Sequence, residues 1–254
     1  MLRLVTIPIS HYCEKARWAL ERAGLPYREE PHVQGLHRLY ARRAGGGSTV
    51  PVLVTPQGPI GESAEILAWV DAQLEPERRL AGEGAEAVEV AALCRRLDER
   101  LGPHGRRLIY VRMFAQPELM LRFNNQGVPR WEDRALRAGL PLAERFIARA
   151  LDISPGVEVQ DEVVVWEEFD WVAGLLADGR PFLAGERFTA ADLTFAALAA
   201  PVVLPSRYGV KLPAAELLDA PTGALVARGR EHPAGRFALR MVAEQRTPPQ
   251  ATSA

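Results

Sequence analysis

Short apolar runs alternate with helically spaced apolar positions over the first third of the chain. Residues 2–9 are rich in β-branched side chains and contain a proline near their end, which predicts a strand. From residue 11 to residue 23, alanine and leucine recur at intervals of three and four, which predicts a helix that stops at Gly24. The same reading predicts a strand at 26–33, a helix at 36–44, a strand at 50–54, a short strand ending at 60–63, and a helix at 66–74. The predicted order is βαβα followed by ββα.

The pattern changes after Leu74. Residues 75–87 are polar and poor in apolar side chains, which is typical of a linker between domains. Residues 139–151 and 163–177 then keep helical spacing. We therefore expect an α/β domain over 1–76, an all-helical domain over 88–247, and a disordered tail over 248–254.

Composition narrows the possible partners. With a formal net charge of −1, the chain has no overall field to attract nucleic acid or an anionic membrane. No stretch approaches the roughly 20 apolar residues of a membrane span. The five histidines are scattered, so no metal-binding spacing is seen. Two cysteines are too few for a disulfide framework, which favours a reducing, cytoplasmic compartment. The predominance of arginine over lysine suggests a GC-rich bacterial genome.

The loop between the first strand and the first helix holds two candidate catalytic residues, Ser10 and Cys13. The N-terminus of a helix stabilises a thiolate and lowers the pKa of a thiol, so Cys13 is a candidate reactive thiol. Ser10 can instead donate a hydrogen bond to the thiolate of a bound ligand. Without a neighbouring base, serine itself is a poor nucleophile. The structural alternative for Cys13 is a small residue buried in the first helical turn.

Two later segments are candidate binding sites. A cis bond between Val50 and Pro51 would turn the backbone of Val50 toward a bound peptide, although the dipeptide by itself favours a trans proline at a strand start. Glu62 and Ser63 precede a predicted helix, where Ser63 can bind a carboxylate or simply cap the helix. Glu62 can pair with an ammonium group. Together they would hold the headgroup of an α-amino acid.

Two further patterns have structural interpretations. Thr189 and Asp192 form a capping box before an apolar run, and Phe188 with Leu193 can complete a hydrophobic staple. A basic stretch between residues 95 and 112 is interrupted by acids, which favours a solvated helix face or a dimer contact over a nucleic-acid site.

The order and spacing of these segments resemble the cytosolic glutathione transferases over about the whole chain. The residues that carry the resemblance are "SHYCEKAR" (10–17), "STVPVL" (48–53), "GES" (61–63) and "GERFTAADLTF" (185–195). The resemblance implies a thioredoxin-like first domain and an all-helical second domain. It also implies a detoxifying enzyme and a homodimer. In such an enzyme the glutathione thiolate attacks a small, apolar electrophile that is held in a cleft lined by the helical domain.

The resemblance also implies a role for each candidate residue. Val50 would pair through its backbone with the cysteinyl part of glutathione beside cis-Pro51. Glu62 and Ser63 would hold the γ-glutamyl headgroup. Ser10 stands where serine-type members place the hydroxyl that stabilises the thiolate, whereas cysteine-type members carry cysteine at that position.

The chain departs from the family pattern in two places. Thr49 stands where a lysine often reaches the glycyl carboxylate of glutathione, and His37 or Arg38 are candidate substitutes. The segment 113–134 resembles an insertion near the second substrate, where Tyr110, Phe114, Phe123 and Trp166 are candidate lining or core residues.

Two other functions remain open at this point. Cys13 would support glutathione-dependent thiol–disulfide exchange or reductive dehalogenation. A non-catalytic interaction module would keep the fold without binding glutathione.

Overall fold

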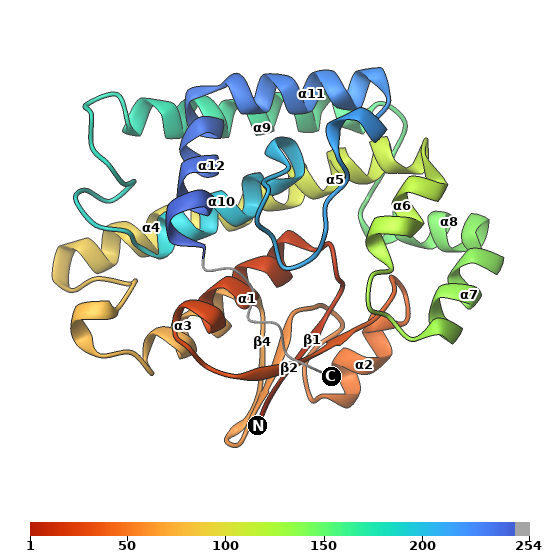
Figure 1. Cartoon of the computed structure of the whole chain (residues 1–254), viewed down its shortest axis with the longest axis horizontal. Coiled ribbons are helices and arrows are strands. Elements are labelled where there is room, and N and C mark those ends of the chain that lie inside the picture. Colours follow the sequence, from red (N-terminus) through yellow and green to blue (C-terminus); the bar gives the residue numbers. More distant parts are fainter. Residues whose placement is uncertain (247–254) are drawn as a thin grey trace.

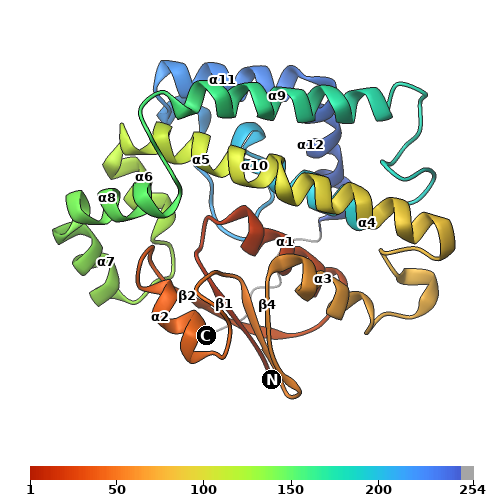
Figure 2. The same cartoon turned by 180° about the vertical axis from the view of Figure 1, so that it is seen from behind.

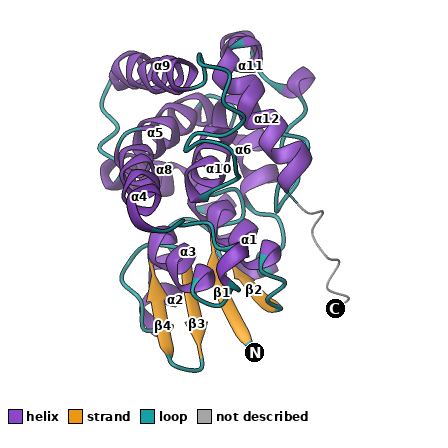
Figure 3. Ribbon diagram, turned by 90° about the vertical axis from the view of Figure 1, so that its left-hand side faces the viewer, coloured by secondary structure: helices purple, strands orange, loops and turns teal. Residues whose placement is uncertain are grey.

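The computed structural model describes residues 1–246 as an α/β part followed by an all-helical part (Figure 1). The helical part lies over one face of the α/β part, as the side view shows (Figure 3). This arrangement confirms the predicted fold class. The tail predicted at 248–254 lies outside the described residues.

A four-stranded mixed sheet with the order β2-β1-β3-β4 forms the base of the first part (Figure 3). The central strand β1 runs parallel to β2 and antiparallel to β3, which in turn pairs antiparallel with β4. The elements are β1 (Leu2–Thr6), α1 (His11–Arg22), β2 (Tyr27–Pro31), α2 (His37–Arg43), β3 (Val52–Thr55), β4 (Gly58–Gly61) and α3 (Ser63–Asp71). The predicted order of strands and helices is confirmed.

The second part is helical throughout the described residues. Its elements are η1 (Pro76–Arg78), α4 (Gly84–Glu99), α5 (Leu101–Phe114), α6 (Pro117–Asn124), α7 (Arg130–Ala138), α8 (Leu140–Ala150), α9 (Val157–Leu175), α10 (Ala190–Val203), η2 (Ala215–Leu217), α11 (Ala220–Glu231) and α12 (Pro233–Gln245). The helices predicted at 139–151 and 163–177 correspond to α8 and α9. Both front and back views place α6, α7 and α8 beside α2 (Figures 1 and 2). Within residues 1–246, no helix has the length and apolar character needed to cross a membrane.

Helix α10 forms the centre of the helical part. Nearly every residue of α10 is buried, and the helix packs against α1, α4, α5, α11 and α12. Its first turn contains the predicted capping box. The buried Asp192 carboxylate accepts hydrogen bonds from the Leu183 N–H at 2.7 Å, the Thr189 N–H at 2.7 Å and the Thr189 hydroxyl at 2.8 Å. One side chain therefore fixes both the start of α10 and the preceding loop.

Helix α1 lies between the sheet and the helical part and is buried on all sides (Figure 3). The charged residues of its first two turns are buried as well: the exposed fractions are 2% for Glu14, 0% for Lys15 and 1% for Arg17. Lys15 Nζ lies 2.7 Å from the Asp98 carboxylate of α4. Because a buried charge is costly unless it is paired, this contact ties α1 to the helical part.

We predict that Asp192→Ala lowers the free energy of unfolding by about 2–4 kcal/mol, because three donors in the core lose their acceptor. Chemical denaturation followed by circular dichroism measures the loss. The matched control is Asp178→Ala, which removes an exposed pair with Arg180 and should leave the unfolding midpoint unchanged. Equal midpoints for the two variants would contradict the structural role of Asp192.

Candidate functional site

A cavity of about 250 Å³ lies between the two parts of the molecule. Its walls come from the β1–α1 loop, the start of α2, the loop before β3, and from helices α5, α8 and α10 with the segment 204–222. Most of the wall is apolar, and both parts of the molecule contribute a few polar side chains to it. Such a cleft with a few convergent polar groups is typical of a binding site for small molecules.

Ser10 lies at the N-terminus of helix α1 and lines the cavity. Its Oγ accepts a hydrogen bond from the Cys13 N–H at 3.4 Å, which makes Ser10 the N-cap of α1. A hydroxyl has one donor and two acceptor positions, so the cap leaves the O–H free to donate. The helix N-terminus adds a partial positive charge at the same place. Ser10 can therefore stabilise an anion in the cavity.

Cys13 lies one turn further along α1 and is fully buried outside the cavity lining. Burial raises the pKa of its thiol to about 11, although the Arg17 guanidinium and the Ser10 hydroxyl act in the opposite direction. The expectation that the helix N-terminus lowers this pKa is therefore wrong, because loss of hydration outweighs the helix dipole. The structural alternative, a small residue packed in the first turn, describes the position of Cys13.

The loop before β3 supplies a second stretch of cavity wall through Ser48, Thr49 and Val50. The peptide bond between Val50 and Pro51 is cis, so the trans alternative is excluded. Val50 precedes the first ladder residue of β3, Val52, and its backbone is not part of the sheet. The backbone of Val50 is therefore placed to pair with an extended ligand.

Glu62 and Ser63 adjoin this loop without lining the cavity themselves. The Thr49 hydroxyl donates a hydrogen bond to Glu62 Oε1 at 2.8 Å and so connects the pair to the cavity wall. Glu62, with φ of 55°, is the N-cap residue of α3, and Ser63 is the first helical residue. The prediction of Ser63 as the N-cap is therefore wrong by one position. Both residues remain at the N-terminus of α3, where backbone N–H groups favour an anion.

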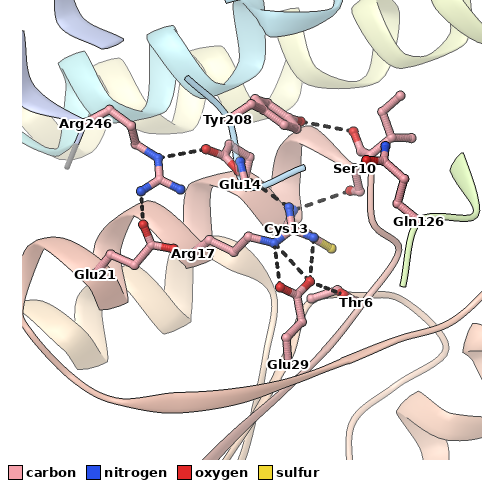
Figure 4. A network of polar contacts seen from close by, with 12 residues as sticks. Thr6, Ser10, Cys13, Glu14, Arg17, Glu21, Glu29, Gln126, Tyr208 and Arg246 are labelled. Atoms are coloured by element: carbon pink, nitrogen blue, oxygen red, sulfur yellow. Dashed lines mark hydrogen bonds and ion pairs between the residues drawn. The ribbon is translucent and has the colours of Figure 1, made fainter. Parts of the chain in front are cut away.

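A buried network of charges lies behind Ser10 (Figure 4). Glu14 accepts hydrogen bonds from the Gly209 N–H at 2.8 Å and from Arg246 Nε at 2.9 Å. Arg17 lies on the other side and pairs with Glu29 of β2 at 2.6 Å. These contacts join α1 to the sheet and to two segments near the end of the chain, which fixes the loop that carries Ser10.

Two tyrosines hold this loop and the start of α1 in place, and sequence reasoning did not identify their contacts. The Tyr208 hydroxyl donates to the Ile9 carbonyl at 3.0 Å, and the Tyr12 hydroxyl donates to the Asp98 carbonyl at 3.0 Å. Tyr12 packs against Gly102 of α5, where an added methyl group would overlap its hydroxyl. A lone tyrosine in a loop or helix has no distinctive sequence pattern, so no signal in the sequence could have identified these contacts.

The arginines of the basic stretch at 95–112 differ in their surroundings. Arg96 and Arg100 pair with Glu168 of α9 at 2.8 and 2.5 Å, and Arg107 pairs with Asp161 of the same helix at 2.5 Å. Both carboxylates are fully buried. Arg106 differs from its neighbours on α5, since it lines the cavity. The stretch is therefore solvated only in part: Arg95 is exposed, while Arg96, Arg100 and Arg107 pair with buried carboxylates.

Of the four aromatic candidates, only Tyr110 lines the cavity. Its hydroxyl accepts a hydrogen bond from Gln34 Nε2 at 3.0 Å. Phe114 packs against the Tyr110 ring, Phe123 is buried, and Trp166 packs against Phe169 of α9. Phe123 and Trp166 belong to the core, as their structural interpretation had it, whereas Phe114 is only partly buried. His37 and Arg38 of α2 line the cavity, as do Phe146 and Ile147 of α8.

Comparison with known proteins identifies the architecture. Residues 4–78 match the family model described as "Glutathione S-transferase, N-terminal domain". No curated protein matches the sequence. The glutathione transferase F2 of Populus trichocarpa superposes over 97% of this chain and 99% of its own, with a TM-score of 0.61 and 17% identity. The chain has the glutathione transferase fold.

Two further solved structures share this fold. A glutathione S-transferase from Rhodospirillum rubrum F11 covers 98% of this chain and 97% of its own, with a TM-score of 0.58 and 20% identity. A glutathione S-transferase-I bound with the ligand lactoylglutathione covers 94% of this chain and 99% of its own, with a TM-score of 0.55 and 17% identity. The similarity thus extends over both parts of the molecule.

We predict that Cys13 is unreactive in the folded protein. At pH 8 a thiol with a pKa of about 11 is ionised to about one part in a thousand, and burial excludes reagents further. In a Cys94→Ser background, Ellman's reagent should modify Cys13 about a hundredfold more slowly in the native protein than in guanidinium.

The control for this experiment is Ser48→Cys in a background that lacks Cys94, since position 48 lines the cavity. The added thiol should react rapidly while Cys13 stays protected. Rapid modification of Cys13 in the native protein would mean that the first turn of α1 opens.

Proposed function

We propose that this protein is a glutathione transferase that activates the glutathione thiol for attack on a small, mainly apolar electrophile. The observation that carries the proposal is the position of Ser10. Its hydroxyl lies at the N-terminus of α1 and lines the cavity between the two parts, and the helix cap uses it only as an acceptor. The cis Val50–Pro51 bond and the family-model match over residues 4–78 support the same function.

One hydrogen bond together with the dipole of helix α1 is sufficient to lower the pKa of the glutathione thiol as the proposal requires. A free thiol has a pKa of roughly 8.5 and is mostly protonated at neutral pH. A hydrogen bond to a charged acceptor contributes about 1.5–3 kcal/mol, which corresponds to a fall in pKa of about one to two pH units. Ser10 would hold the glutathione sulfur in place while the thiol proton leaves to solvent. The thiolate would then form the new carbon–sulfur bond while the electrophile's leaving group departs.

We assign the rest of the tripeptide to residues of the N-terminal part. The backbone of Val50 would pair with the cysteinyl residue beside Pro51, as the resemblance to the family implies. Glu62 would pair with the γ-glutamyl ammonium, while Ser63 and the N-terminus of α3 would hold its carboxylate. Thr49 joins the two groups through its hydrogen bond to Glu62.

The glycyl carboxylate lacks the lysine that the family often uses. Arg38 of α2 lines the same cavity and supplies a positive charge there. We therefore assign Arg38 to this carboxylate. His37 is unsuited to the task as a cation, because burial and the neighbouring Arg38 lower its pKa to about 4.

The two substrates are assigned to the two parts of the molecule. We assign glutathione binding to residues 1–76 and electrophile binding to 88–247, in a cytoplasmic homodimer with a detoxifying role, as the family resemblance implies. Thiol–disulfide exchange through Cys13 has no support from its buried, protonated thiol.

We predict that Ser10→Ala raises the pKa of bound glutathione by about one to two pH units, because the thiolate loses its hydrogen-bond donor. Ultraviolet absorbance of the bound thiolate, titrated against pH, measures this value. At neutral pH, kcat/KM for conjugation should fall about tenfold to a hundredfold.

The matched control is Ser48→Ala, which removes another hydroxyl from the cavity wall. Its titration should follow that of the unmodified protein. An unchanged thiolate titration in Ser10→Ala, or its loss in Cys13→Ala, would assign thiol activation to another group. No glutathione binding at all would refute the transferase.

We predict that Glu62→Gln weakens glutathione binding about tenfold or more, because the ammonium group loses its charged partner. Isothermal titration calorimetry measures the dissociation constant. The pKa of the bound thiol should stay constant, since Glu62 acts on the headgroup. Binding equal to that of the unmodified protein would remove Glu62 from the site.

A further inference from the structure

The cavity carries positive charge without any internal counter-charge. Of the described residues that line it, two are arginines, Arg38 and Arg106, and none is aspartate or glutamate. Its two histidines stay neutral near pH 7: burial and the Arg106 guanidinium lower the pKa of His11 to about 3, and the pKa of His37 is about 4. The walls therefore favour a ligand with a negative charge.

Among the described residues, Arg106 is the one arginine of α5 that forms no ion pair with a carboxylate. On the same helix, Arg107 pairs with Asp161 and Arg112 pairs with Glu162. Arg106 instead lies over the Tyr12 ring, with its Cζ 5.7 Å from the ring centroid. Its Nε is buried and has no hydrogen-bond partner among the described residues. A partly buried guanidinium without a carboxylate partner gains from an anionic ligand, since a carboxylate or phosphate can accept two of its N–H groups.

Further polar atoms in the cavity wall lack partners. His11 Nε2 and Thr222 Oγ1 are buried without a hydrogen bond, and the two side chains are 4% and 0% exposed. The Thr222 hydroxyl can donate a hydrogen bond, whereas the single N–H of the neutral His11 ring is used on the backbone of Gly102. Gln34 Oε1 is also unpaired, while Gln34 Nε2 is used on the Tyr110 hydroxyl, which leaves the Tyr110 O–H free to donate. Unsatisfied buried donors are costly, so a ligand that accepts from them is favoured.

We propose that Arg106 binds an anionic oxygen group of the electrophile, so that the preferred substrates combine an apolar body with a carboxylate. The inference rests on the proposed transferase function and names its substrate class. Arg106 and Thr222 belong to the helical part, to which the electrophile is assigned. The apolar body would lie along Ile109 and Met113 of α5 and Ile147 of α8.

The first test measures binding without chemistry. Calorimetry compares 4-methylbenzoate with the uncharged 4-methylbenzamide on the full-length protein saturated with glutathione. We expect the carboxylate to bind about tenfold or more tightly, which is the effect of one charge-assisted hydrogen bond. Arg106→Gln should remove the preference and Arg106→Lys should keep part of it. The control is Arg95→Gln on the exposed face of α4, which should behave as the unmodified protein.

The outcomes of this test separate the possible roles of Arg106. Equal affinity for the two probes, or a preference that survives Arg106→Gln, overturns the proposal. Displacement of 4-methylbenzoate by glutathione also overturns it, since Arg106 would then serve the tripeptide.

The second test measures turnover with glutathione. The substrates are 4-(chloromethyl)benzoate and benzyl chloride; in each, the thiolate forms a carbon–sulfur bond and chloride leaves with the electron pair. The ratio of kcat/KM for the charged over the uncharged substrate should be about ten or more and should fall to about one in Arg106→Gln. A ratio near one in the unmodified protein overturns the proposal. A protein that conjugates neither substrate but still prefers 4-methylbenzoate would refute the transferase function and retain the anion site.

Discussion

The pairing of the buried charges on α1 is the constraint on which the rest of the structure depends. Lys15 pairs with Asp98 of the helical part, and Arg17 pairs with Glu29 of the sheet. Glu14 binds Arg246 near the end of the described chain. Leaving one partner of such a buried pair alone costs about 3–5 kcal/mol, so each pair specifies where its partner must lie. Together they fix α1 against both parts of the molecule at once.

The cavity is a consequence of this arrangement. Its walls come from segments far apart in the sequence, and they face one another because α1 is held between the two parts. The N-terminus of α1 then points into the space, with Ser10 at its first turn. A hydroxyl on a surface loop would lose much of its effect to water and to motion. Here the cap on the Cys13 N–H and the Tyr208 contact to Ile9 hold the loop in one conformation.

The strands and helices of the N-terminal part were predictable because each has strong local periodicity and a local stop signal, such as Gly24 after α1. The cis bond at Val50–Pro51 was predictable only through the family resemblance, since the dipeptide by itself favours a trans bond, whereas the place of Ser10 before α1 was predictable from the local strand and helix pattern. The partners of the charged residues in α1 and α5 were not predictable. The sequence shows Glu14, Lys15 and Arg17 as charged positions of a helix, and it shows the arginines of α5 as part of a basic stretch. Their partners lie far away in sequence, as with Arg107 and Asp161, so the local sequence cannot identify them.

Ser10 and Cys13 share one helix end and differ in what surrounds them. The helix dipole acts on both, and by itself it favours a thiolate at position 13. Burial acts on Cys13 alone and raises the pKa of its thiol to about 11. The dipole contributes at most about 2 kcal/mol, whereas full desolvation of an ionised group can shift a pKa by up to about 3–5 pH units. Desolvation therefore decides the outcome: the residue that keeps its proton packs the core, and the hydroxyl that faces the cavity is left to stabilise an anion supplied from outside.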